Sequence, residues 1–162
     1  MIRFDVSTLL KAPLGASLTL SIDSGPQNLT DLEVDFLRGE VRATRIESGI
    51  FVQGTVATQI HQECIRCLAP VTLPVEFHLE ETYRLPGTKL TEEATYAVGS
   101  DGWIDLTPLL REQAWLSIPM KVLCQPECKG LCPHCGINFN EASCSCEHDE
   151  IDPRLEALKE LL

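Results

Sequence analysis

The chain has 162 residues, of which 44% are hydrophobic and 23% are charged, a composition typical of a globular domain rather than a disordered chain. Its 13 Lys and Arg side chains are outnumbered by 24 Asp and Glu, so the formal net charge is −11. This excess argues against a protein that binds nucleic acid mainly through phosphate groups, and it favours basic protein partners. Since neither a signal peptide nor a run of ~20 apolar residues is present, we expect a cytoplasmic protein with no membrane association.

The first half of the chain alternates apolar and polar residues, as strands with one buried face do. The alternating stretches are residues 2–6, 18–22, 32–36, 50–60 and 71–79, and pairing is expected to resume over 41–47, beyond Gly39. Pro74 falls on the polar phase of the last stretch, which indicates an edge strand or a bulge. We expect a twisted, mainly antiparallel sheet within residues 1–84.

Residues 85–102 are rich in Gly, Pro and acidic residues, and we interpret them as a mobile connector. Thr107 is then a candidate N-cap, because Pro108 follows at the first helical position. Pro119 is expected to end this helix, and a second helix is expected from Asp152 to the C-terminus. Together these elements predict an α+β fold in one integrated domain, with residues 103–162 holding both helices and a cysteine-rich segment between them.

Eight cysteines occur as four closely spaced pairs, which is the form in which proteins offer ligands to zinc. Thiols stay reduced in the cytoplasm, so disulfides are not expected there. The sequence therefore predicts two zinc ions per chain, each bound by four cysteines. The predicted ligands are Cys64, Cys67, Cys124, Cys128, Cys132, Cys135, Cys144 and Cys146.

The pairs can be divided between two ions in more than one way. Cys132 and Cys135 precede the Cys144 pair by one short loop, which closes at low entropic cost. That division leaves the Cys64 pair, at the tip of a predicted hairpin, to meet the Cys124 pair. In the main alternative, the two Cys-x-x-Cys knuckles share one ion and the remaining two pairs share the other.

Other chemistries fit the cysteines less well. Cys132-Pro-His-Cys135 matches the active-site tetrapeptide of some disulfide oxidoreductases, but those need a helix to begin at the first cysteine, and Gly136-Ile-Asn-Phe-Asn140 is not a helical sequence. Iron–sulfur ligation is a further alternative. Three histidines near the cysteines are candidate substitute ligands, although eight cysteines already complete two sites. They are His61, His134 and His148.

No motif for hydrolysis or for phosphate binding is present, and a complete four-cysteine site has no open position for a substrate. We therefore expect a protein that is not an enzyme and has no small-molecule substrate. Zinc-bound thiolates are negative, and three basic residues near them are candidates to offset that charge: Arg66, Lys121 and Lys129.

Several segments together resemble the bacterial and plastid YceD family. They are Cys64-Ile-Arg-Cys67-Leu68, Trp103-Ile-Asp-Leu106, the run from Cys128 through Gly-Leu-Cys132-Pro-His-Cys135-Gly136 to Asn140, and Asp152-Pro-Arg-Leu155. The family is implicated in accumulation of the large-subunit ribosomal RNA, and its genes often neighbour that of a small large-subunit ribosomal protein. Some members lack the Cys132-to-Cys146 cluster, which favours the first division of the cysteines.

The resemblance implies an accessory role in biogenesis of the large ribosomal subunit. In the first mechanism, the acidic surface binds a basic ribosomal protein or a pre-ribosomal particle, and Glu76, Glu80 and Glu81 are candidate contacts. In the alternative, the zinc knuckles contact rRNA directly, although naked RNA should bind weakly to so acidic a chain. A thiol redox enzyme is the third possibility.

Overall fold

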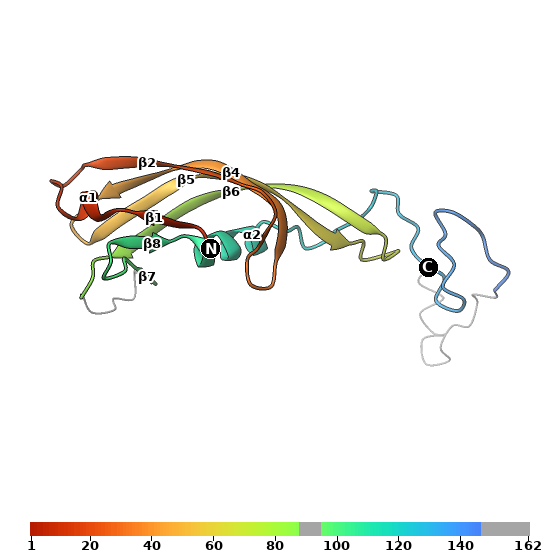
Figure 1. Cartoon of the computed structure of the whole chain (residues 1–162). Coiled ribbons are helices and arrows are strands. Elements are labelled where there is room, and N and C mark those ends of the chain that lie inside the picture. Colours follow the sequence, from red (N-terminus) through yellow and green to blue (C-terminus); the bar gives the residue numbers. More distant parts are fainter. Residues whose placement is uncertain (88–94, 147–162) are drawn as a thin grey trace, which may run out of the picture.

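A computed structural model describes residues 1–87 and 95–146 of the chain. Its main feature is one six-stranded sheet (Figure 1). The strands of this sheet, in spatial order, are β2 (Ser17–Ser24), β4 (Glu33–Arg45), β5 (Gly49–Glu63), β6 (Pro70–Arg84) and β7 (Tyr96–Ala97), with β3 (Gln27–Asn28) paired to β4. The remaining described elements are β1 (Arg3–Asp5), α1 (Ser7–Leu10), β8 (Trp103–Asp105) and α2 (Thr107–Leu116).

Each of the five alternating stretches predicted as strands overlaps an observed strand, and β2, β4, β5 and β6 pair antiparallel with their neighbours. Two differences concern continuity and pairing. Residues 33–45 form one strand rather than two, and β1 leaves the main sheet to pair antiparallel with β8. The α+β class with a mainly antiparallel sheet is therefore confirmed, but the sheet extends beyond residue 84 through β7.

Strand β4 runs through Gly39 because this position has no side chain to accommodate. Gly39 lies opposite Val56 on β5, and Gly54 of β5 lies opposite Val41 on β4. A Cβ on Gly39 would overlap the carbonyl oxygen of Thr55 and would approach the Cα of Val56 to 2.9 Å. Glycine at these positions therefore permits close pairing of β4 with β5.

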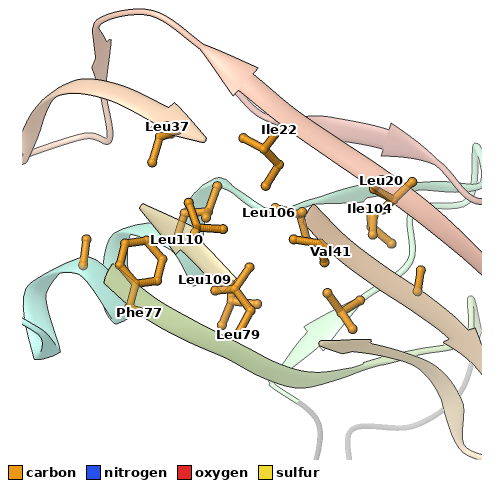
Figure 2. Close-up of a cluster of buried hydrophobic side chains, with 14 of the residues drawn as sticks. Leu20, Ile22, Leu37, Val41, Phe77, Leu79, Ile104, Leu106, Leu109 and Leu110 are labelled. Carbon is orange, nitrogen blue, oxygen red and sulfur yellow. The ribbon is translucent and has the colours of Figure 1, made fainter. Parts of the chain in front are cut away.

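The inner face of the sheet forms the core, and α2, β1 and β8 lie along that face (Figure 1). Apolar side chains from β2, β4 and β6 meet those of β8 and α2 (Figure 2). Leu106, Leu109 and Leu110 are at most 1% exposed, so the apolar face of the helix is its packing face. Among the described residues, no helix is both long and apolar enough to cross a membrane.

The start of α2 differs from the prediction that Thr107 is its N-cap. The N-cap is Leu106, and Thr107 is the first helical residue. The Thr107 hydroxyl instead accepts a hydrogen bond from the N–H of Ile2 at 2.8 Å, while Asp105 Oδ1 accepts the N–H of Thr107 at 2.9 Å. Asp105 thus satisfies the free helix amide, and Thr107 joins the helix to β1.

The segment predicted as a connector contains ordered structure in its described part. Strand β7 pairs parallel with the end of β6, and Tyr96 stacks on Tyr83 with 5.3 Å between ring centroids. The Tyr83 hydroxyl donates to the carbonyl of Asp105 at 3.0 Å, and burial raises the pKa of Tyr83. Residues 88–94 of the connector and the predicted C-terminal helix, residues 152–162, lie outside the described residues.

The close pairing of β4 and β5 generates a first prediction. Replacing Gly39 by Ala should lower the free energy of unfolding by about 1–3 kcal/mol, because the added methyl group forces the paired backbones apart. Urea unfolding measures this change. Gly25→Ala is the matched control, since a Cβ there meets nothing within 4 Å. Equal stability of the two variants would contradict the close approach.

Candidate metal centre

The cysteines gather at one end of the molecule, beside the tip of the β5–β6 hairpin (Figure 1). The chain leaves α2 and reaches this tip, where residues 120–146 follow in turns and loops. Four sulfur atoms meet there from two distant parts of the sequence. This first cysteine group consists of Cys64, Cys67, Cys124 and Cys128.

The sulfur atoms of the first cysteine group are spaced as the corners of a metal-sized tetrahedron. All lie within 4.8 Å of one another, with Cys64 Sγ 3.8 Å from Cys128 Sγ and Cys67 Sγ 3.5 Å from Cys124 Sγ. A tetrahedral zinc ion with Zn–S bonds of ~2.3 Å separates its sulfurs by about 3.8 Å. Three of the cysteines are buried and Cys124 is exposed, so a metal here would be largely shielded from solvent.

A tight turn at the hairpin tip places Cys64 and Cys67 on the same side. The N–H of Cys64 donates to the carbonyl of Ala69 at 2.8 Å, and the N–H of Leu68 donates back to the carbonyl of Cys64 at 2.9 Å. Leu68 takes a left-handed conformation with φ 58° to close the turn. Leu68 is 59% exposed and Ile65 is 56% exposed, so both apolar residues project from the tip.

Residues 122–131 dock on this tip through backbone hydrogen bonds. The N–H of Ile65 donates to the carbonyl of Val122 at 3.0 Å, and the N–H of Leu131 donates to the carbonyl of Arg66 at 3.2 Å. The Arg66 guanidinium donates to the carbonyl of Cys128 at 2.7 Å. Only a few partly buried apolar side chains support the contact, namely Ala69, Val71, Leu123 and Leu131.

The backbone around the first group favours the thiolate form of one cysteine. Burial opposes ionisation of Cys64, but N–H groups of Cys124, Cys67 and Arg66 outweigh it and lower the pKa of Cys64 to about 6. The hydrogen bond with Cys67, followed by burial, raises the pKa of Cys124 to about 12. A metal ion would displace the protons that the four thiols hold between them, because cysteine binds metal as the thiolate.

A second cysteine group repeats this arrangement with residues that are close in sequence. It consists of Cys132, Cys135, Cys144 and Cys146, whose sulfurs also lie within 4.8 Å of one another. The Cys132–Cys135 turn has the geometry of a zinc knuckle: the N–H of Cys135 points at Cys132 Sγ at 3.4 Å, and Gly136 has φ 74°. Burial opposes ionisation of Cys132, but N–H groups of Cys135 and His134 lower its pKa to about 6.

Asn140 links the two groups, and the sequence analysis did not identify it. Its position lies between the cysteines of the second group, yet its amide nitrogen donates to Cys128 Sγ of the first group at 3.3 Å. Its amide oxygen accepts the N–H of Lys129 at 2.9 Å. The only signal in the sequence is that Asn favours such local turns, which does not reveal a bond to a distant cysteine.

The structure divides the cysteines in the first of the two predicted ways. The Cys64 pair lies beside the Cys124 pair, and the Cys132 pair lies beside the Cys144 pair. His61 is engaged elsewhere: Nε2 lies 2.9 Å from Asp35 and Nδ1 lies 3.2 Å from Thr72. His134 is exposed and stands outside both groups, whereas His148 lies outside the described residues. No helix begins at Cys132, so the condition for a thioredoxin-like thiolate is absent there.

The predicted basic residues lie on the segments that form the first group. Arg66 lies on the hairpin tip, Lys129 follows Cys128, and Lys121 precedes the residue whose carbonyl bonds to Ile65. All three are exposed. They place positive charge beside four sulfurs that carry negative charge when a metal is bound.

Comparison with known proteins gives a family match over most of the chain. The sequence model described as "Large ribosomal RNA subunit accumulation protein YceD" matches residues 52–162. This range contains all eight cysteines and excludes β1 to β4 and the first three residues of β5. No solved structure gives a significant match.

Individual relatives extend the similarity to the whole chain. An uncharacterized protein of Mycobacterium tuberculosis is 33% identical over 98% of this chain and 74% of its own length. The uncharacterized protein YlbN of Bacillus subtilis is 32% identical over 67% of this chain and 63% of its own length. A Zea mays protein, named "Large ribosomal RNA subunit accumulation protein YCED homolog 1, chloroplastic", is 31% identical over 66% of this chain and 47% of its own length.

The bridge made by Asn140 generates a second prediction. Asn140→Ala should weaken the affinity of the first cysteine group for added Zn²⁺ by about tenfold, because groups that hydrogen-bond to metal ligands typically contribute 10–100-fold. Competition with a chromophoric chelator measures this affinity in reduced protein. Glu141→Ala is the matched control, since within residues 1–87 and 95–146 that exposed side chain bonds only to Asn138. An unchanged affinity in Asn140→Ala would refute the bridge.

Proposed function

This chain belongs to the YceD family, and on that premise we propose that it promotes accumulation of the large-subunit ribosomal RNA by binding a basic ribosomal protein. The observation that carries the proposal is the family match, because the family and its Zea mays member are both named for that RNA. The proposed site of action is the cytoplasm, where bacterial ribosomes are assembled. The proposed role is not catalytic.

We further propose that each cysteine group holds one zinc ion with a structural role. The tetrahedral spacing of the sulfurs and the four soft donors in each group suit Zn²⁺. Four cysteines fill all four positions of such a site, which leaves none for a substrate. Bound zinc would supply the free energy that holds residues 120–146 in a fixed conformation, because this segment buries few apolar side chains.

Charge supports a basic protein as the partner. The formal charge of −11 counts neutral thiols, and each zinc ion bound by four thiolates makes the chain more negative still. Such a field attracts basic proteins and speeds their encounter, and it repels free RNA. Binding should therefore weaken as the salt concentration rises.

A second mechanism draws support from the first cysteine group. Arg66, Lys121 and Lys129 are exposed around it, together with the apolar side chains of the hairpin tip. Such a cluster suits direct contact with rRNA through a few phosphates. A pull-down at moderate salt separates the two mechanisms: a basic ribosomal protein retained after RNase treatment favours capture of the protein, whereas loss of all partners favours direct rRNA contact.

The different sequence spans of the two groups generate a third prediction. Wild-type protein purified in reductant should contain two zinc ions, and Cys64→Ser and Cys144→Ser should each contain one. Cys64→Ser should lower the melting temperature more and expose residues 120–131 to protease, because the first group joins distant segments while the second group keeps its ion. Cys144→Ser should expose only residues 132–146.

Elemental analysis, thermal melting and mapping of protease cleavage sites measure these effects. A zinc content of one or none in the wild-type protein would contradict two zinc sites. Equal and local damage from both substitutions would show that the first group does not hold the hairpin tip to the segment after α2.

The proposed function generates a fourth prediction. Depletion of the protein should lower the ratio of large-subunit to small-subunit rRNA, and re-expression of the wild-type protein should restore it. Sedimentation profiling with rRNA quantification measures the ratio during rapid growth and in the cold. An unchanged ratio in both conditions would refute the assembly role, whereas a lower ratio without any captured ribosomal protein would refute the capture mechanism alone.

A further inference from the structure

Strand β6 forms an open edge of the sheet over most of its length (Figure 1). On one side it pairs with β5 along its whole length, from Pro70 opposite Glu63 to Arg84 opposite Gly49. On the other side, among the described residues, only Tyr83 and Arg84 are paired, with β7. An unpaired edge presents a row of free N–H and C=O groups that can pair with another strand.

The pairing with β7 shows which residues point their backbone groups outward. The carbonyl of Arg84 accepts the N–H of Val98 at 2.9 Å, so the backbone groups of Arg84 face the β7 side. Since this direction alternates along a strand, Glu76, His78 and Glu80 also face that side. In the described part of the chain, none of these three has a backbone partner on that side.

At each end of this free stretch, the outward backbone N–H is either absent or already bonded. Pro74 has the same phase and has no N–H to donate, as expected for proline at an edge. At the other end, the N–H of Thr82 donates to Glu81 Oε1 at 3.2 Å. The free edge is therefore the short stretch from Glu76 to Glu80, which we call the acidic edge.

The side chains of the acidic edge define the charge of a suitable partner. Glu76 and Glu80 are exposed on the outer face of the sheet, and neither has an ion-pair partner within the described residues. Their neighbours on β5, Ala57 and Gln53, are uncharged. Glu81 was a candidate contact on the same surface, but its side chain has the opposite phase and points to the inner face.

We propose that the acidic edge binds an extended basic segment of a partner protein as an additional β-strand. This inference rests on the proposed function, which supplies the basic protein as partner. It adds the way in which that partner binds. Lys or Arg side chains opposite Glu76 and Glu80 would face these carboxylates on the outer surface of the sheet. Backbone bonds to Glu76, His78 and Glu80 would hold the added strand in register.

The same charges disfavour pairing of a second copy of this chain in the register centred on His78. If two copies paired antiparallel about His78, Glu76 of each would lie directly opposite Glu80 of the other. Like charges at such positions destabilise a pair of strands. The carboxylates thus oppose self-association in this register and favour a basic strand at the edge.

The test uses the full-length, zinc-loaded protein and a ten-residue peptide that alternates lysine and threonine. Amide exchange followed by NMR should show that the peptide slows exchange at Glu76, His78 and Glu80. Exchange at Phe77 and Leu79 should not change, because their N–H groups already bond to β5. A peptide N-methylated at its lysine amides keeps the charge but should bind at least tenfold more weakly, because it cannot donate to the edge.

Two variants at one position provide the matched comparison. His78→Pro removes the edge N–H at a phase where the strand already accepts Pro74. It should lower the affinity for the peptide by about tenfold relative to His78→Ala. Both variants lose the bond between His78 Nδ1 and Thr55 Oγ1. A difference in peptide affinity between them therefore reports the loss of the backbone N–H at position 78. The double variant Glu76→Lys/Glu80→Lys should abolish binding of the basic peptide while retaining the wild-type fold by circular dichroism.

Three results would contradict the binding of a basic strand at the acidic edge and would leave the proposed assembly role unaffected. They are equal binding of the methylated and unmethylated peptides, absence of protection at the three edge amides, and a dimer in sedimentation that dissociates in the Glu76→Lys/Glu80→Lys variant. An unchanged subunit ratio on depletion, with edge protection intact, would instead refute the assembly role.

Discussion

The contact between the tip of the β5–β6 hairpin and the segment after α2 is the constraint on which the cysteine-bearing end of the molecule depends. Backbone bonds from Ile65 and Leu131 bring the two segments together, and four sulfurs then lie at tetrahedral spacing. Few apolar side chains support the contact. Burial alone is therefore a weak source of stability there, and a metal bound by the first cysteine group would provide the main link between segments more than fifty residues apart.

The sheet and the cysteine-bearing end have separate sources of stability but are joined through β5 and β6. The sheet has a continuous apolar core on its inner face, closed by α2 and β8. The same two strands carry the first cysteine pair at their turn and present the acidic edge along β6. A partner bound at that edge would lie on the strand that leads directly to the hairpin tip.

Residue patterns predicted those parts of the structure that depend on local spacing. Alternation located the long strands, and the short loop between Cys135 and Cys144 favoured the observed cysteine groups. Features that depend on contacts between distant segments were missed, including the pairing of β1 with β8, the parallel strand β7 and the bond from Asn140 to Cys128. The opposite directions of Glu80 and Glu81 do follow from strand alternation, so grouping them on one surface was an avoidable error.

Hydrogen exchange with mass spectrometry, on zinc-loaded protein and on protein treated with a chelator, tests the central claim most directly. The account predicts that chelation speeds exchange throughout residues 120–146 and at the hairpin tip, residues 64–69, while β4 and the paired amides of β5 keep their protection. Unchanged protection of residues 120–146 after complete removal of the metal would contradict it, because the segment would then be held without the ion.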